Sequence, residues 1–120
     1  MEHAKIAIFE DDELARQLLA ELLEYSGHEV VAKAGSFEES VKVVEALEPG
    51  AVDVVLLDGN LTEGRNDSRE GSQIAQALRA KFTEEFRIVN ISASDSPILG
   101  ADVNIPKYDS GEIRNYISEL

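Results

Sequence analysis

The chain has 120 residues, of which 43% are hydrophobic, and 24 acidic against 11 basic side chains give it a formal net charge of −13. This length makes one domain with one core, and the lack of cysteine excludes a disulfide framework, a thiolate metal site and a cysteine nucleophile. The negative charge opposes direct binding to nucleic acid or anionic membranes, and no apolar run reaches the roughly 18 residues of a membrane span. We therefore expect a single cytoplasmic domain over residues 1–120.

The first half of the chain alternates between strand and helix patterns. A short apolar run at 6–9 predicts a strand, and leucines at helical spacing over 14–23 predict a helix. A second strand is predicted at 30–32. An S-x-x-E capping box that begins at Ser36 opens a second helix, which the pair Pro49–Gly50 ends.

The same alternation continues in the second half. Residues 52–57 form an apolar run that is typical of a strand buried on both faces. A polar loop rich in glycine, asparagine and aspartate follows over 58–70, before a helical pattern over 74–82. Residues 88–91 predict a fourth strand.

After the fourth strand the pattern weakens. A short strand is predicted at 102–105, and a last helix over 113–117 has Asp109 as its expected N-cap. The stretch between these strands contains Pro97 and lacks helical periodicity. We expect 94–101 to be a mobile loop in place of a helix.

This order of elements predicts a parallel sheet with helices on both faces, because parallel neighbours need crossover connections. Ligands of such sheets bind beyond the carboxyl ends of the strands. Polar side chains gather at those ends in the sequence. They are Glu10, Asp11 and Asp12 after the first strand, Asp58 and Asn60 after the third, Ser92 after the fourth and Lys107 near the fifth.

Asp58 ends the apolar run "VVLL", which suits either a plain turn or a reactive carboxylate. Carboxylates that converge repel one another unless a cation lies between them. The expected donors are all oxygen atoms, and His3 and His28 are expected to be structural or exposed, so Mg²⁺ is the natural cofactor. A carboxylate beside Mg²⁺ can attack a phosphoryl donor while a lysine and a hydroxyl stabilise the developing charge.

The segments "IAIFEDDELARQLLAELLEYSGHEVV", "DVVLLDGNL", "IVNISAS" and "GADVNIPK" resemble the receiver domain of two-component response regulators, over nearly the whole chain. The resemblance implies an α/β, flavodoxin-like fold with a five-stranded parallel sheet in the order 2-1-3-4-5. The fourth helix is expected to be short or missing here. It also implies a histidine kinase or histidine phosphotransfer protein as partner, and a signalling phosphoacceptor that promotes only its own phosphorylation and dephosphorylation.

Roles for individual residues follow from the same resemblance, position by position. It implies that Glu10 and Asp11 are the acidic pair that holds Mg²⁺, that Asp58 is phosphorylated, that Asn60 offers its backbone carbonyl to the metal, that Ser92 is the switch hydroxyl and that Lys107 is the family's invariant lysine.

The chain departs from the family pattern at several positions. Thr62 stands where a proline is usual, and the helix-opening Gly71 comes later than usual, so the loop is longer. Asn104 replaces the aromatic switch residue, and Pro106 precedes Lys107 where a proline normally follows. We therefore expect the usual aromatic relay to be absent and the domain to be a monomer, with specificity carried by the first helix and the 59–70 loop.

Two other function classes remain open at this stage. One is a pseudo-receiver that is never phosphorylated and serves as a protein-interaction module. The other is a phosphatase, because "LLDGNLT" is similar to the first motif of the haloacid dehalogenase family. Thr62 fits that motif, but Asn60 replaces the acid that is its usual proton donor.

Overall fold

Strands and helices alternate along the part of the chain that the computed structural model describes, which is 1–62, 68–83, 85–92 and 97–120. No helix in these residues is long and apolar enough to cross a membrane. The elements are β1 (Lys5–Phe9), α1 (Glu13–Tyr25), β2 (Glu29–Ala34), α2 (Phe37–Ala46), β3 (Val54–Leu57), α3 (Arg69–Lys81), β4 (Arg87–Asn90), β5 (Val103–Asn104) and α4 (Ser110–Glu119).

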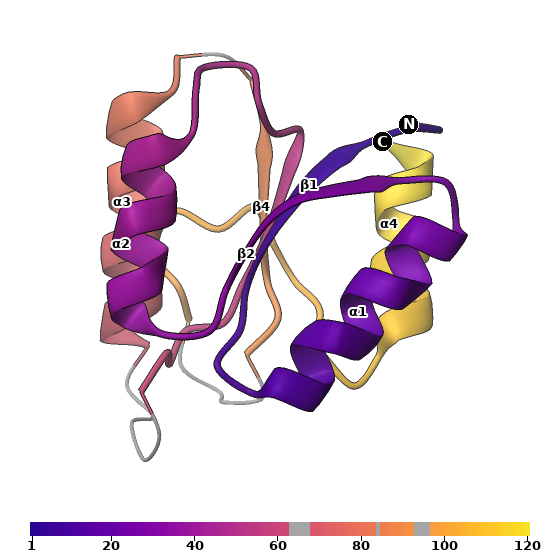
Figure 1. Ribbon diagram of the computed structural model, residues 1–120, viewed down its shortest axis with the longest axis horizontal. Coiled ribbons are helices and arrows are strands. Elements are labelled where there is room, and N and C mark those ends of the chain that lie inside the picture. The colour runs from indigo at the N-terminus through magenta and orange to yellow at the C-terminus, as the bar shows by residue number, and fades with distance from the viewer. Residues whose placement is uncertain (63–67, 84, 93–96) are drawn as a thin grey trace.

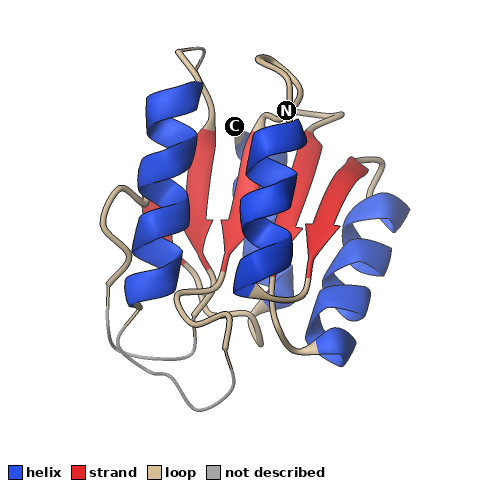
Figure 2. Cartoon of the chain, turned by 60° about the vertical axis from the view of Figure 1, so that its left-hand side comes forward, coloured by secondary structure: helices blue, strands red, loops and turns tan. Residues whose placement is uncertain are grey.

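The strands form one parallel sheet of five strands in the order β2-β1-β3-β4-β5. Figure 2 shows the strand arrows pointing toward the same edge of the sheet. This is the flavodoxin-like order that the family resemblance implied, and the order of the strands across the sheet reverses between β1 and β3. The carboxyl ends of these two central strands therefore meet where ligands bind in such sheets.

Helices cover both faces of the sheet, as predicted. Figure 1 shows α2 and α3 on one side and α1 and α4 on the other. The strand residues alternate between these layers: Phe9 and Leu57 pack with α2 and α3, whereas Ile8 and Leu56 pack with α1 and α4. Because both faces are covered, every residue of β3 is buried, which explains its unbroken apolar sequence.

Side-chain caps begin two of the helices. Asp12 accepts a hydrogen bond from an amide in the first turn of α1, and Ser36 does the same for α2. Glu39 of the predicted capping box instead reaches the amide of Gly35, at 2.9 Å. Asp109 precedes α4 as expected, but its side chain makes no capping hydrogen bond, so that prediction holds in position only.

The connection from β4 to β5 carries no helix among its described residues. A turn at 99–100 precedes β5 by two residues, in agreement with the predicted short or missing fourth helix. The expected mobile loop over 94–101 lies partly outside the described residues, and its mobility stays a prediction. β5 is shorter than the predicted 102–105, and β3 begins at Val54, after the expected start at 52.

Arg79 holds this connection against the body of the domain. Its guanidinium donates to the Gly100 carbonyl at 3.2 Å and to the Asp102 carboxylate at 2.7 Å. Asp102 in turn accepts the Ile88 amide at 2.7 Å. These contacts join the last turn of α3 to β4 and to the residue before β5.

Candidate functional site

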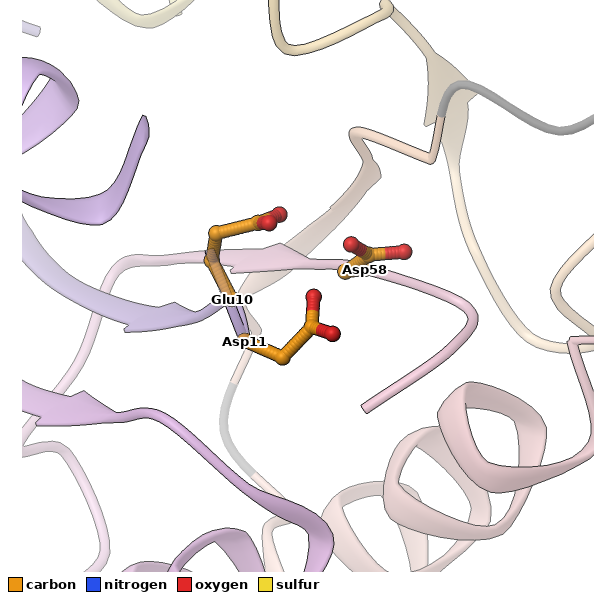
Figure 3. A group of neighbouring side chains, drawn as sticks. All are labelled: Glu10, Asp11 and Asp58. Atoms are coloured by element: carbon orange, nitrogen blue, oxygen red, sulfur yellow. The ribbon is translucent and has the colours of Figure 1, made fainter. Parts of the chain in front are cut away.

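Three carboxylates meet at the carboxyl ends of β1 and β3. Phe9 and Leu57 are register partners on these adjacent strands, so Glu10, Asp11 and Asp58 follow them side by side. One carboxylate oxygen from each lies within 4.8 Å of the others. Figure 3 shows the three side chains directed toward a common space. The structure thus brings together the acids that the sequence placed on different strands.

Burial makes this cluster electrostatically strained. Glu10 is fully buried and Asp58 is 4% exposed. Burial, together with the proximity and the charge of the Asp58 carboxylate, raises the pKa of Glu10 to about 8. Burial and the charge of Asp58 also raise the pKa of Asp11. Within the described residues, Glu10 Oε2 is buried without a hydrogen-bond partner. The cluster is therefore short of positive charge.

Lys107 supplies a cation to the cluster. Its backbone amide donates to the Ile91 carbonyl at 3.0 Å, which places the residue just beyond β5. Its ammonium donates to Glu10 Oε1 at 2.8 Å and to Asp58 Oδ2 at 3.4 Å. Burial opposes the charged form, but the hydrogen bond to Glu10 and the charges of both acids outweigh it and raise the pKa of Lys107. Lys107 is therefore a cation at neutral pH, despite the displaced proline beside it.

Asn60 and Ser92 lie at the same edge. The Asn60 amide donates to Asp58 Oδ1 at 3.0 Å, and its side-chain oxygen accepts the Ser68 amide at 2.9 Å. Ser92 is buried, and its amide donates to the Asn90 side chain at 2.9 Å. The loops after β3 and β4 are thus each held by an asparagine. All six site residues predicted from the sequence, Glu10, Asp11, Asp58, Asn60, Ser92 and Lys107, stand at this end of the sheet.

Sequence reasoning missed two further residues that belong to the site. Arg16 of α1 donates to the Glu10 carbonyl at 2.8 Å and so holds the loop after β1. Glu70 is buried and accepts the Leu61 amide at 3.1 Å and the Thr62 hydroxyl at 2.8 Å. Neither residue belongs to a motif. An acid in the first turn of a helix that follows a polar loop is a sequence signal that could have pointed to Glu70.

The donor set fits a small, hard divalent cation. Three carboxylates converge, one of their buried oxygens lacks a hydrogen-bond partner among the described residues, and all candidate ligands are oxygen atoms. Burial, and after it the charge of Asp58, raises the pKa of Glu10 and of Asp11, and a divalent ion would favour the charged form of both acids. The residues that could hold it are Glu10, Asp11 and Asp58, with the backbone carbonyl of Asn60 added by the resemblance.

Comparison with known proteins agrees with this geometry. The transcriptional regulatory protein PdtaR of Mycobacterium tuberculosis is 32% identical over 77 residues, which are 64% of this chain and 34% of PdtaR. The chain thus spans about a third of that curated relative's length. The signal receiver domain of the putative response regulator NarL from the same organism has 25% identity and a TM-score of 0.74, covering 99% of this chain and 96% of that one.

A second solved structure and a family model complete the comparison. The response regulator TrrA of Thermotoga maritima, in complex with Mg²⁺–BeF, has a TM-score of 0.74 at 23% identity, covering 99% of this chain and 98% of that one. The model described as the response regulator receiver domain matches residues 6–110, which carry the sheet and the acidic cluster. The chain belongs to the response regulator receiver domain family.

Proposed function

We propose that this domain is a phosphoacceptor of a two-component phosphorelay, in which Asp58 takes a phosphoryl group in a Mg²⁺-dependent reaction. The donor is a histidine kinase or a histidine phosphotransfer protein. The observation that carries the proposal is the acidic cluster of Glu10, Asp11 and Asp58 with the Lys107 ammonium on two of its members.

The step itself is a transfer of one phosphoryl group. An Asp58 carboxylate oxygen forms a bond to phosphorus while the phosphorus–nitrogen bond of a phosphohistidine breaks, and the electron pair returns to the imidazole. Water later hydrolyses the acyl phosphate, which restores Asp58 and releases inorganic phosphate. The chain acts only on its own phosphoryl group, so we do not class it as an enzyme.

The surrounding residues suit that step. Mg²⁺, when bound, supplies positive charge against the phosphoryl oxygens and against the three acids. Lys107, now shared between Glu10 and Asp58, can pair with the incoming phosphoryl group. The Ser92 hydroxyl can donate to the same group. The TrrA complex contains Mg²⁺–BeF, but at 23% identity that likeness shows only the fold, so the metal is proposed from this chain's own donors.

The alternatives find less support. In a pseudo-receiver the acids need not converge, whereas here they lie within 4.8 Å and retain the lysine. A phosphatase of the haloacid dehalogenase type would need an acid at Asn60, whose side chain instead binds the Ser68 amide. The geometry therefore favours a phosphoacceptor over both alternatives.

Acetyl phosphate with Mg²⁺ tests the proposal. The parent should gain one phosphoryl group by intact-mass spectrometry, while Asp58→Asn and the parent in EDTA should gain none. Asp53→Asn is the matched control, because Asp53 lies at the other end of β3, next to Lys5, where its carboxylate binds the Lys5 amide. Equal modification of Asp58→Asn and the parent, or indifference to EDTA, would refute the assignment.

A further inference from the structure

The loop that joins β3 to α3 closes on itself at its base. The Gly59 carbonyl accepts the Gly71 amide at 2.9 Å. A Cβ on Gly71 would lie 2.6 Å from the Gly59 Cα and 2.8 Å from the Asp58 carbonyl oxygen, so only glycine permits this approach. The described flanks, 58–62 and 68–71, are therefore the two sides of a closed neck, as in an Ω-loop.

Two side chains cross this neck. The Asn60 side-chain oxygen accepts the Ser68 amide at 2.9 Å. In the opposite direction, Glu70 Oε1 accepts the Leu61 amide at 3.1 Å and Oε2 accepts the Thr62 hydroxyl at 2.8 Å. Glu70 is only 5% exposed, and the Leu61 side chain packs into the core beneath α2 and α3. Each side of the neck is thus fixed by the other.

The backbone at Ser68 is strained by this arrangement. Its φ of 58° is in the left-handed region, which residues other than glycine rarely adopt. A Cβ on Gly59 would lie 2.3 Å from the Ser68 hydroxyl oxygen, so the Ser68 side chain occupies the space beside Gly59. Such strain persists where surrounding contacts over-determine the conformation, and it concentrates at functional sites.

The peptide group between Asn60 and Leu61 links this neck to the acidic cluster. Its N–H donates to Glu70 at 3.1 Å. Because a trans peptide is planar, its carbonyl, which belongs to Asn60, points in the opposite direction, away from Glu70. The preceding N–H, of Asn60 itself, donates to Asp58. Glu70 therefore sets the direction of the carbonyl that is the fourth proposed metal ligand.

We propose that Glu70 is a positioning residue for the metal site, which holds the Asn60 carbonyl in the direction that a cation requires. This inference rests on the proposed function. Thr62 occupies the position where the family usually has a proline, and the two hydrogen bonds that Glu70 accepts, from the Leu61 amide and the Thr62 hydroxyl, restrain the same stretch of backbone. The longer loop of this chain thus brings its own support for a ligand that a flexible loop would hold poorly.

Three variants separate orientation from charge. Glu70→Ala removes the hydrogen bonds to the Leu61 amide and the Thr62 hydroxyl. Glu70→Gln removes the negative charge but keeps an oxygen that can accept the Leu61 amide, so it should rescue the site. Thr62→Val removes only the hydroxyl contact and leaves the Leu61 amide bound.

Arg79→Ala is the control for a general loss of stability. Arg79 binds Phe86, Gly100 and Asp102 near the amino ends of the strands, so its loss should destabilise the fold without reaching the metal site. Thermal unfolding of each variant in EDTA provides the stability against which its Mg²⁺ affinity is compared.

Mg²⁺ affinity is the decisive readout, measured by calorimetry and by titration of backbone amide NMR signals without any phosphodonor. Glu70→Ala should bind Mg²⁺ about 10-fold or more weakly than the parent, the range expected when support of a metal ligand is lost. Glu70→Gln, Thr62→Val and Arg79→Ala should stay close to the parent. The Leu61 amide signal should shift and lose protection from exchange only in Glu70→Ala.

The outcomes distinguish this inference from the proposed function. A parent that binds no Mg²⁺ overturns both. A parent that binds Mg²⁺, with a folded Glu70→Ala variant of equal affinity, overturns the positioning role alone. If Glu70→Ala does not fold by circular dichroism, Glu70→Asp is measured in its place. It keeps the charge but is shorter by one methylene, so its Mg²⁺ affinity should follow the Leu61 amide: weaker where that amide loses protection from exchange, and equal to the parent's where it keeps protection. The opposite pairing of these two readouts would overturn the role.

Discussion

The two ends of the sheet treat their polar side chains in opposite ways. At the amino end, Asp53 accepts the Lys5 amide at 2.9 Å, Asp102 accepts the Ile88 amide at 2.7 Å, and His28 accepts the Ala4 amide at 3.0 Å. Each of these side chains satisfies a backbone donor and joins neighbouring segments. At the carboxyl end, three acids face one ammonium, and a buried carboxylate oxygen of Glu10 lacks a partner among the described residues.

This difference distinguishes the residues that support the fold, at the amino end, from those that form the candidate site, at the carboxyl end. Satisfied polar groups stabilise a single structure, whereas an unsatisfied cluster destabilises the domain until something binds there. The acids at the amino end should therefore matter for stability whether or not Mg²⁺ is present. Residues at the carboxyl end should have effects that depend on the metal. The effects on stability are measurable as changes in the free energy of unfolding.

Lys107→Ala should have the largest effect. Removal of this cation leaves Glu10 and Asp58 buried and unpaired, and breaking a buried pair costs about 3 kcal/mol. We expect this loss in EDTA and a smaller loss in Mg²⁺, since the ion replaces the missing charge. Urea unfolding in both buffers measures it, with Lys42→Ala, which lies in an exposed pair, as control. Equal losses in the two buffers would count against a metal at this end.

Lys107→Ala should also bind Mg²⁺ at least as tightly as the parent, because the competing ammonium is absent. Its response to beryllofluoride, followed by NMR, should nevertheless be impaired, because Lys107 no longer pairs with the phosphoryl analogue. An unaltered spectral response would assign that pairing to another residue.

Asp102→Ala should destabilise the domain by about 2 kcal/mol, because it leaves the buried Ile88 amide unsatisfied and Arg79 without its carboxylate. In contrast to Lys107→Ala, the loss should be the same in EDTA and in Mg²⁺. Glu85→Ala, at an exposed pair with Arg87, should change stability little. A loss that Mg²⁺ reduces would show that the two ends are coupled.

Asp58→Asn should stabilise the metal-free domain, by about 1 kcal/mol, because it removes one of the charges that repel within the cluster. The sign is opposite to that of most substitutions at buried positions. Added Mg²⁺ should stabilise the parent more than the variant. A destabilised variant in EDTA would mean that the cluster is not under repulsion.

His28 should give the smallest effect, visible only in acid. Burial, with smaller contributions from the N-terminal charge and His3, lowers the pKa of His28 below its ordinary value of 6.5. The unfolded chain therefore binds a proton at this residue at a higher pH than the folded protein does. Stability from neutral His28 is fully present above pH 6.5 and declines as the pH falls below it.

His28→Asn keeps an oxygen to accept the Ala4 amide and removes the titration. Its stability between pH 7 and pH 5 should decline less steeply than the parent's. Identical slopes would show that His28 is protonated in the folded protein as readily as in the unfolded chain.

Local signals in the sequence were sufficient for most of the architecture. The cap at Ser36 and the helical spacing of leucines in α1 involve residues a few positions apart, so both can be recognised from the sequence alone. The meeting of Glu10 and Asp58 was also predictable, since carboxyl ends of parallel strands share an edge. Asp109 failed as a side-chain cap because a suitable residue type does not dictate where its carboxylate points.

Contacts between distant residues were decided only by the tertiary structure. Glu70 reaches Leu61 across a loop whose length differs from the family pattern, and no periodicity marks such a pair. Arg79 contacts Asp102 because the connection before β5 lies against the end of α3. Nothing in the sequence around either residue indicates that contact. Propensity and patterning act over a few residues. Which distant side chains then satisfy one another depends on how the packed layers place their backbones.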